Sequence, residues 1–193
     1  LEYVKANDEL AEELESKIYR QYIYDTMTQV GVEIKAEDET AVIVRTTADG
    51  LTYLDGNGAS STGKGILNMT IPTLDMVETI YFKIIAENGD ESDVYTLNIE
   101  KMSTDATLSE VYVDGEKVEL NEEGKYVTTI YDINTSPLVK AVTTHEKANV
   151  RIALGSEKLH ISEQNVNVSN SRQITIPITV RSQAGTSKVT YIS

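Results

Sequence analysis

The sequence predicts an all-β protein built from two tandem antiparallel β-sandwiches, and three observations support this fold class. Apolar and polar residues alternate with a period of two through most of the 193 residues, a pattern typical of half-buried strands. Gly, Asn, Asp and Ser separate the alternating runs at short intervals, as in sandwiches and barrels. The chain also matches itself at an offset of 107 residues.

The clearest pair of strands is a hairpin around residue 89. Residues 80–86 alternate, Glu87–Asp90 supplies a turn in which Asn and Gly adopt positive φ at low cost, and residues 94–99 resume the alternation. Pro177 cannot donate to a ladder, which predicts an edge or bulge position for its strand. Further runs predict strands at residues 30–36, 41–45, 66–71, 108–113, 126–131, 139–142, 149–154, 174–180 and 188–192.

One segment has the opposite local preference. Residues 9–16 (Glu-Leu-Ala-Glu-Glu-Leu-Glu-Ser) have high helix propensity. The segment is shorter than the ~12 to 15 residues that an isolated helix needs. Residues 7–16 also align with residues 114–123, which have a hairpin pattern, so the repeat favours strands over a helix here.

The internal repeat defines two domains. Loop deletions shorten the offset to 96 near the end of each copy, where residues 86–89 match residues 182–185. We therefore expect a first domain over residues 1–103 and a second over residues 104–193, each the usual size of a small sandwich. The linker, residues 101–106, is short and lacks Pro and Gly, which favours an end-to-end rod, and the second copy stops within its last strand, so we expect the natural protein to continue. The matching pairs are Ile23-Tyr24-Asp25 with Ile130-Tyr131-Asp132, Val4 with Val111, Thr28 with Thr135, Val32 with Val139, Glu39 with Glu146, Ala41 with Ala148 and Ile43 with Val150.

Several of these segments resemble a known family. Residues 79–89 end in an Ala-x-Asn-Gly turn, residues 94–99 form a Tyr-Thr-Leu-x-Ile strand, and residues 108–115 have a Leu-x-x-Val-x-Val-Asp-Gly pattern. Together they resemble the cadherin-like β-sandwich repeat of bacterial cell-surface and secreted proteins, which has an Ig-like sandwich fold. The resemblance implies an extracellular or cell-surface, non-catalytic module and offers no catalytic residues to carry over. The second copy departs from the pattern at residues 181–192, where Tyr191 comes one position late.

Charge and composition exclude several classes of function. The 31 acidic and 17 basic residues give a net charge of −14, which disfavours nucleic acid and anionic lipid as partners. Residues 1–103 contain 20 acidic and 8 basic residues, so most of the excess lies in the first copy. There is no cysteine, and no run approaches the ~20 apolar residues of a membrane span, so we expect no disulfide and no membrane insertion within this segment.

The search for catalytic motifs favours a protein that is not an enzyme. Residues 58–65 resemble a phosphate-binding loop, but Gly65 stands where that loop needs a Ser or Thr hydroxyl, and a strand follows instead of a helix. We interpret these residues as an inter-strand loop. There are two histidines, His145 and His160. His145 matches Asp38 of the first copy in a loop before a strand, and we interpret it as a solvated loop residue in preference to a proton shuttle or ligand.

Calcium is the one cofactor that the acidic loops suggest. The candidate ligands are Asp38, Asp55, Asp90 and Asp93, which lie in short acidic or turn segments of the first copy. Calcium needs six to eight converging oxygens, and one short cluster rarely supplies them. Solvated loop acids are therefore the favoured interpretation, and we expect no cofactor. Any bound cation is expected in the first copy.

A ligand face is suggested by Tyr22 and Tyr24, which are two residues apart and so point to the same side of one strand. Cross-strand packing is the favoured interpretation, and an exposed aromatic face that binds a glycan is the alternative. The function we predict is a spacer, stalk or adhesion module whose partner is an unknown protein or glycan, next to neighbouring domains of the same polypeptide. Carbohydrate binding, or the external sensor segment of a membrane signalling protein, remain the alternatives.

Overall fold

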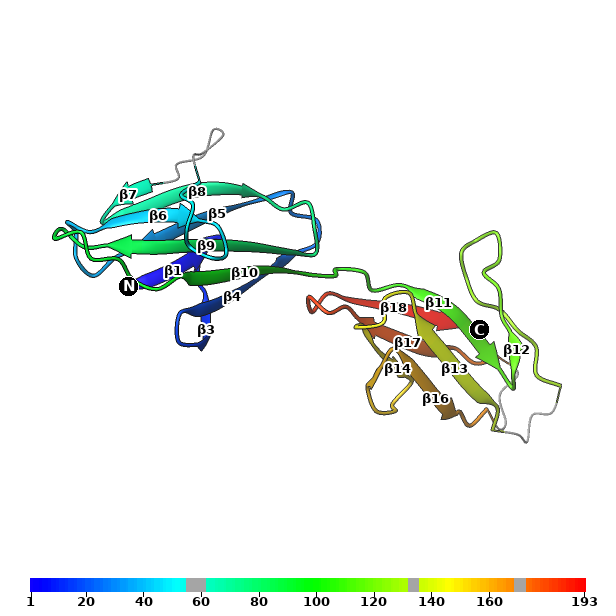
Figure 1. Cartoon of the computed structure of the whole chain (residues 1–193). Coiled ribbons are helices and arrows are strands. Elements are labelled where there is room, and N and C mark those ends of the chain that lie inside the picture. Colours follow the sequence, from blue (N-terminus) through cyan, green and yellow to red (C-terminus); the bar gives the residue numbers. More distant parts are fainter. Residues whose placement is uncertain (55–61, 132–135, 169–172) are drawn as a thin grey trace. The chain divides into compact units, whose positions relative to one another are not determined.

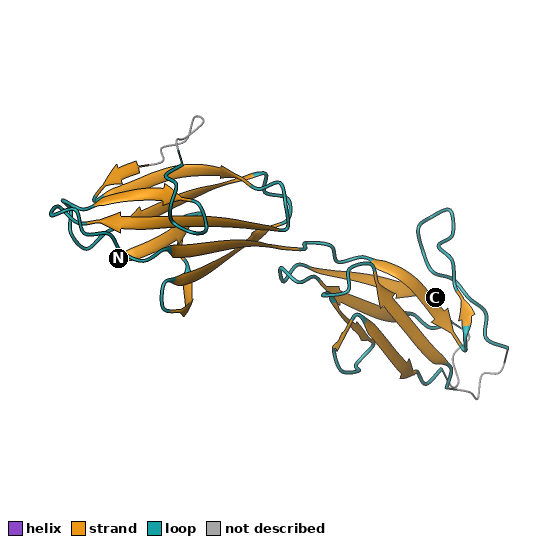
Figure 2. Cartoon of the chain, in the orientation of Figure 1, coloured by secondary structure: helices purple, strands orange, loops and turns teal. Residues whose placement is uncertain are grey.

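The computed structural model describes residues 1–54, 62–131, 136–168 and 173–193, and these form two compact units, Leu1–Met102 and Ser103–Ser193 (Figure 1). All regular structure in those ranges is β-strand (Figure 2). The unit boundary falls one residue before the one expected from the sequence. None of the described segments is a helix of the length and hydropathy that would let it span a bilayer.

Unit 1 is a sandwich of two sheets. The first has the strand order β2-β1-β5-β8 and the second the order β3-β4-β10-β9-β6-β7. Neighbouring strands are antiparallel except β4 and β10, which run parallel. This arrangement is that of an Ig-like sandwich. The strands are β1 (Tyr3–Ala6), β2 (Glu9–Leu10), β3 (Glu12–Glu15), β4 (Ile18–Tyr24), β5 (Gln29–Lys35), β6 (Val42–Thr46), β7 (Thr62–Lys64), β8 (Ile66–Pro72), β9 (Val77–Ile85) and β10 (Tyr95–Met102).

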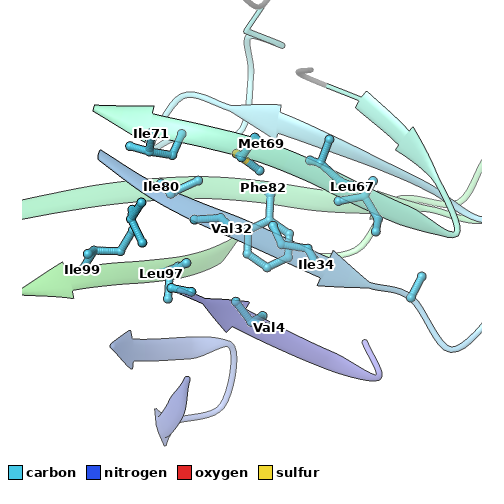
Figure 3. Packing of buried hydrophobic residues seen from close by; sticks show 14 of the residues in the cluster. Val4, Val32, Ile34, Leu67, Met69, Ile71, Ile80, Phe82, Leu97 and Ile99 are labelled. Carbon is cyan, nitrogen blue, oxygen red and sulfur yellow. The ribbon is translucent and has the colours of Figure 1, made fainter. Parts of the chain in front are cut away.

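The core of unit 1 forms where the alternating apolar residues of the two sheets meet. Phe82 lies among aliphatic side chains from both sheets and is fully buried (Figure 3). Its ring stacks on that of Tyr95, the residue opposite it in the β9–β10 ladder, with 5.1 Å between ring centroids. The buried neighbours labelled in Figure 3 are Val4, Val32, Ile34, Leu67, Met69, Ile71, Ile80, Leu97 and Ile99.

Unit 2 repeats this architecture with fewer paired strands. Its sheets have the orders β12-β11-β13-β16 and β15-β14-β17-β18. The central strands β11, β13, β14, β17 and β18 take the places of β1, β5, β6, β9 and β10. The strands are β11 (Leu108–Val113), β12 (Glu116–Lys117), β13 (Leu138–Thr143), β14 (Asn149–Ile152), β15 (Lys158–Leu159), β16 (Ile161–Asn165), β17 (Ile176–Arg181) and β18 (Ser187–Ile192).

The all-β prediction is confirmed, including the strands in place of a helix at residues 9–16, where β2 and β3 lie. The strand predicted at residues 126–131 is wrong. Tyr126 forms only isolated bridges, with Leu120 and Ile192, whereas the matching residues of unit 1 form the long strand β4. Beside these bridges, the Ser193 N–H donates to the Tyr126 carbonyl and the Thr128 N–H donates to the Ser193 carbonyl, both at 3.0 Å.

The edge or bulge position predicted for Pro177 is also wrong. Its strand, β17, lies between β14 and β18 in the sheet. The carbonyl of Pro177 accepts a hydrogen bond from the Ala153 N–H at 2.8 Å. In an antiparallel ladder the nitrogen of a residue points to the same side as its carbonyl. The proline nitrogen therefore faces Ala153, where the chain leaves β14 with φ of 48°, and no ladder donor is required there.

The displaced tyrosine of the second copy is explained by the register of β18. Ile192 pairs with Ile176 just as Leu97 pairs with Ile80 in unit 1, and both Ile192 and Leu97 are buried. Tyr191 therefore points to the outer face, where it is 52% exposed. Tyr95 of unit 1, by contrast, points inward onto Phe82.

Candidate functional site

The tyrosine pair predicted from the sequence lies on the outer face of β4. Gln21 and Ile23 of this strand are buried, so Tyr22 and Tyr24 between and after them face outward, 36% and 52% exposed. Across the parallel ladder, Glu100 of β10 lies beside Tyr22 and Met102 lies beside Tyr24. We call this surface of β4 and β10 the tyrosine face. It combines two phenol rings, a carboxylate and a thioether on one sheet surface.

An arginine changes the chemistry of the first tyrosine. The Arg20 guanidinium carbon lies 4.8 Å from the centroid of the Tyr22 ring, a cation–π distance. The same guanidinium donates to Glu12 on β3 at 2.8 Å, and this hydrogen bond raises the pKa of Arg20. One face of Tyr22 is therefore occupied by Arg20, and Tyr24 is the more open ring. The contact could not be predicted from the sequence, because β3 and β4 pair with a register shift between Glu13 and Glu15.

A hollow of about 280 Å³ adjoins the tyrosine face. Gln21 Nε2 donates to Glu9 Oε2 at 3.1 Å within its lining, and Leu10 at its rim is 67% exposed. Carboxylate, amide and guanidinium groups beside an open aromatic ring can hydrogen-bond and stack on a polar ligand with apolar faces. The lining residues are Asn7, Glu9, Leu10, Glu12, Arg20, Gln21, Tyr22, Ile23, Tyr24, Met27 and Met102.

Unit 2 retains one of the two tyrosines. Tyr131, which matches Tyr24 at the 107-residue offset, is 96% exposed, whereas Thr129 stands in the place of Tyr22. The tyrosine face is thus a feature of unit 1, and Tyr131 is a natural control for its open ring.

The calcium candidates are not brought together. Asp38 Oδ1 accepts hydrogen bonds from the N–H and hydroxyl of Thr40, at 2.8 and 2.6 Å, which closes the turn between β5 and β6. These bonds hold the pKa of Asp38 below its usual value, the hydroxyl bond contributing most. Asp55 lies outside the described residues. Within the described ranges, no three His, Asp or Glu side chains form a group that could hold a metal ion.

The other two candidates lie in the β9–β10 turn, and each has a local partner. Asn88 Nδ2 donates to Asp90 Oδ2 at 2.7 Å. Lys17 forms an ion pair with Asp93, and its hydrogen bond lowers the pKa of that carboxyl. Both carboxylates therefore stabilise the hairpin and its contact with the residue that precedes β4.

A polar cluster that the sequence did not indicate covers the outer face of β9. Lys83 donates to Glu91 Oε2 at 3.0 Å, and the Tyr53 hydroxyl donates to the other oxygen of that carboxylate. The tyrosine bond and then the lysine bond lower the pKa of Glu91. Tyr53 also bridges to Thr46 of β6. The cluster fastens the loop after β6 to the sheet, which is a structural role.

The remaining sequence motifs are turn elements as well. His145 Nδ1 accepts from the Lys147 N–H at 3.2 Å, the counterpart of the Asp38–Thr40 bond. His160 lies at φ of 62° with its ring against Thr143. Of the phosphate-loop look-alike, residues 58–61 lie outside the described ranges, residues 62–64 form β7, and Gly65 is a left-handed turn residue.

Comparison with known proteins gives one kind of match. No family model matches the sequence, and no curated protein matches it. Among solved structures, a chain described as "Structures of Clostridium thermocellum CbhA fibronectin(III)-like modules" has 11% sequence identity and a TM-score of 0.34, covering 98% of this chain and 92% of that chain. A likeness of this degree carries no argument about what the present chain does.

Proposed function

We propose that the chain is a non-catalytic module of a bacterial surface or secreted protein, in which two sandwiches in series separate or display neighbouring domains. One observation carries the proposal. The apolar positions that match at the 107-residue offset are core positions: Val32 and Val139, and Ala41 and Ala148, are all at most 3% exposed. Of the two tyrosines of the tyrosine face, by contrast, unit 2 retains only one. The duplication thus preserves architecture more closely than a site, as expected of a structural module.

Stretching the chain between two surfaces in a force spectrometer tests this role. A spacer built from two separately cored sandwiches is expected to unfold in two events. The extended chains of 102 and 91 residues measure about 340 and 300 Å at ~3.3 Å per residue, and each length increment equals that value less the end-to-end length of the folded unit. A single gradual extension at low force would contradict the proposal, because such a chain could not hold its neighbours apart under load.

A second function, carbohydrate recognition at the tyrosine face, is supported by the polar hollow next to Tyr24. Binding of the full chain to an array of glycans tests it. Loss of a bound glycan with Tyr24→Ala, and retention with Tyr131→Ala, would support recognition in unit 1. Equal binding by both variants, or binding of no glycan by the parent chain, would contradict it.

A further inference from the structure

The two units differ at the outer face of one sheet, which contains β6 and β9 in unit 1 and β14 and β17 in unit 2. In unit 1 the loop after β6 covers this face, since Tyr53 bridges to Thr46 and its hydroxyl donates to Glu91. Val44 of β6 points to this face and is only 4% exposed, although it is not part of the core cluster. The surface is therefore closed in the first copy.

In unit 2 this face is open and carries two arginines. The counterpart loop, residues 153–157, is shorter. The ladder register places Arg151 where unit 1 has Val44, and Arg181 where unit 1 has Ile85. Both arginines are exposed. The second copy thus has two cations in place of two apolar residues, on the face where the covering loop is reduced.

Both arginines line a hollow of about 320 Å³, which we call the arginine hollow. In the ladder Arg151 lies opposite Thr179, and Arg181 lies between Asn149 and Ser187. The two arginines are therefore diagonal neighbours on one face, with Cα atoms about 7 to 8 Å apart. Two guanidinium groups can reach one ligand here, and each has a hydroxyl side chain beside it. The lining residues are Arg151, Glu157, Thr179, Arg181, Gly185 and Ser187.

Neither arginine has a counterion in the described part of the chain. Over those residues Arg151 and Arg181 form no ion pair and no hydrogen bond through their side chains. Like charges at neighbouring positions of a sheet repel each other and lower its stability. The pair therefore favours an anionic ligand over a stabilising role. The ion pairs found in the described part of unit 2 join Lys117 to Glu119, Lys125 to Glu123 and Lys140 to Glu163.

Positive charge is concentrated on this sheet, although the chain as a whole has a net charge of −14. The strands of the sheet contain Arg151, Lys158, Arg181 and Lys188 and no acidic residue. The strands of the opposite sheet contain both signs of charge. At physiological ionic strength the Debye length is about 8 Å, so the potential over the arginine hollow is set by the residues around it. An anion can bind here despite the acidity of the chain.

From these observations we infer that the arginine hollow binds carboxylate groups of an acidic polysaccharide. A guanidinium group pairs with a carboxylate through two parallel hydrogen bonds. The hydroxyls of Thr179 and Ser187 can exchange hydrogen bonds with sugar hydroxyls. Val189 and Tyr191 point outward from β18 on the same face, 45% and 52% exposed, and offer an apolar surface to a sugar ring.

An acidic polypeptide fits this face less well than a glycan. The backbone of β17 is paired with β14 on one side and with β18 on the other, so a peptide cannot add to the sheet beside Arg181. Recognition there depends on side chains alone. The inference goes beyond the proposed spacer function and is independent of the tyrosine face, because every residue that carries it lies in unit 2.

Calorimetric titration of the full chain with a tetramer of galacturonic acid tests the inference. The matched probe is the same tetramer with its carboxyl groups converted to methyl esters, which keeps the sugar rings and removes the charges. Saturable binding of the acid, with at least tenfold weaker binding of the ester, is the expected result. Absence of saturable binding of the acid, or equal binding of the two tetramers, would overturn it.

Three variants locate the site. Arg181→Gln is expected to weaken binding of the acid tetramer at least tenfold. Lys117→Gln makes the same change of charge on the opposite sheet and is expected to leave binding unchanged. Equal loss in these two variants would show a response to total charge and would count against the hollow.

Glu157→Gln gives a result that misfolding cannot imitate. Glu157 is the acidic residue of the lining, and its charge repels a bound carboxylate. Removal of that charge is expected to strengthen binding of the acid tetramer at least twofold. Unchanged or weaker binding would place the tetramer elsewhere on the protein.

A peptide of four glutamates, acetylated and amidated at its ends, separates a glycan from an acidic polypeptide. It carries as many carboxylates as the acid tetramer but has no sugar ring. We expect it to bind at least tenfold more weakly. Binding as tight as that of the tetramer would assign the arginine hollow to an acidic polypeptide and overturn the inference.

Discussion

His160 of unit 2 occupies the position that Gly65 occupies in unit 1, and both residues are left-handed, with φ of 62° and 69°. The Gly65 N–H donates to the Ala41 carbonyl at 2.8 Å, and the His160 N–H donates to the Ala148 carbonyl at the same distance. The same turn therefore uses glycine in one copy and a strained non-glycine residue in the other. The His160 side chain makes a contact that glycine cannot make, since its Nδ1 lies 3.0 Å from the buried Thr143 Oγ1. This contact offsets the strain of the left-handed backbone.

Replacing His160 separates these two effects. His160→Ala keeps the left-handed strain and loses the ring contact, so we expect a loss of about 1 to 2 kcal/mol in the free energy of unfolding of unit 2. His160→Gly loses the contact but relieves the strain, so its loss is smaller. Chemical denaturation followed by NMR signals of unit 2 measures both. Equal losses would show that the backbone at residue 160 is unstrained.

Gly65, in the turn between β7 and β8, is expected to tolerate replacement poorly. A Cβ at this position would lie 2.9 Å from the Glu39 carbonyl oxygen, in addition to the positive φ. Gly65→Ala should therefore destabilise unit 1 by about 1 to 3 kcal/mol. The matched control is Gly31→Ala in β5, where a Cβ meets nothing within 4 Å. That change is expected to be neutral or stabilising, and thermal unfolding of the two variants compares them.

Phe82→Ala is expected to destabilise unit 1 without affecting unit 2. The side chain is fully buried and stacked on Tyr95, and truncation of such a residue costs about 3 to 5 kcal/mol. For a domain of ~100 residues this lowers the unfolding temperature by at least about 12 °C. Leu74→Ala, at an 82% exposed site, is the control and should shift it little.

Calorimetry with NMR assignment of each transition measures this result. Each core cluster draws only on its own unit, which is why the transition of unit 2 should keep its midpoint. A common shift of both transitions would show that the two units unfold together.

Acid is expected to lower the free energy of unfolding of unit 1 by protonating four carboxylates. Each of these carboxylates accepts a hydrogen bond that lowers its pKa. The donors are Thr40 for Asp38, Thr47 for Asp49, Tyr53 for Glu91 and Lys17 for Asp93. A carboxylate whose pKa is lower in the folded state stabilises that state above the unfolded pKa. The usual pKa is 3.8 for an Asp carboxyl and 4.5 for a Glu carboxyl. The stabilisation should therefore be constant near neutral pH and disappear as the pH falls below about 4 toward the folded pKa values.

Urea unfolding of unit 1 between pH 7 and pH 3 measures this effect. Asp38→Asn keeps an acceptor for Thr40 but cannot ionise, so its variant should show a shallower decline with acid than the parent. A decline of the same steepness in both proteins would show that the turn carboxylate is not among the groups responsible.

Much of the strand pattern could be predicted from the sequence because its determinants are local. Alternation fixes which residues face the core, and the Asn88-Gly89 turn fixes the β9–β10 hairpin, since Gly89 adopts φ of 90° as its type predicts. Alternation also places Tyr22 and Tyr24 on one face. The repeat correctly overruled helix propensity at residues 9–16, because a copy of the same fold needs strands in the same places.

Other features depended on partners that only the tertiary structure supplies. Residues 126–131 have a strand pattern, but their pairing is limited to the bridges of Tyr126 with Leu120 and Ile192 and to backbone hydrogen bonds of Tyr126 and Thr128 with Ser193. Pro177 is accommodated inside a sheet because β14 ends beside it. Arg20 lies over the Tyr22 ring while its guanidinium hydrogen-bonds Glu12, a contact that exists only because β3 and β4 pair. The face of a strand that a side chain occupies, and the type of a turn, are set by neighbours in the sequence. The length over which two strands pair, the cavities and the ring contacts depend on which distant strands lie beside the residues concerned.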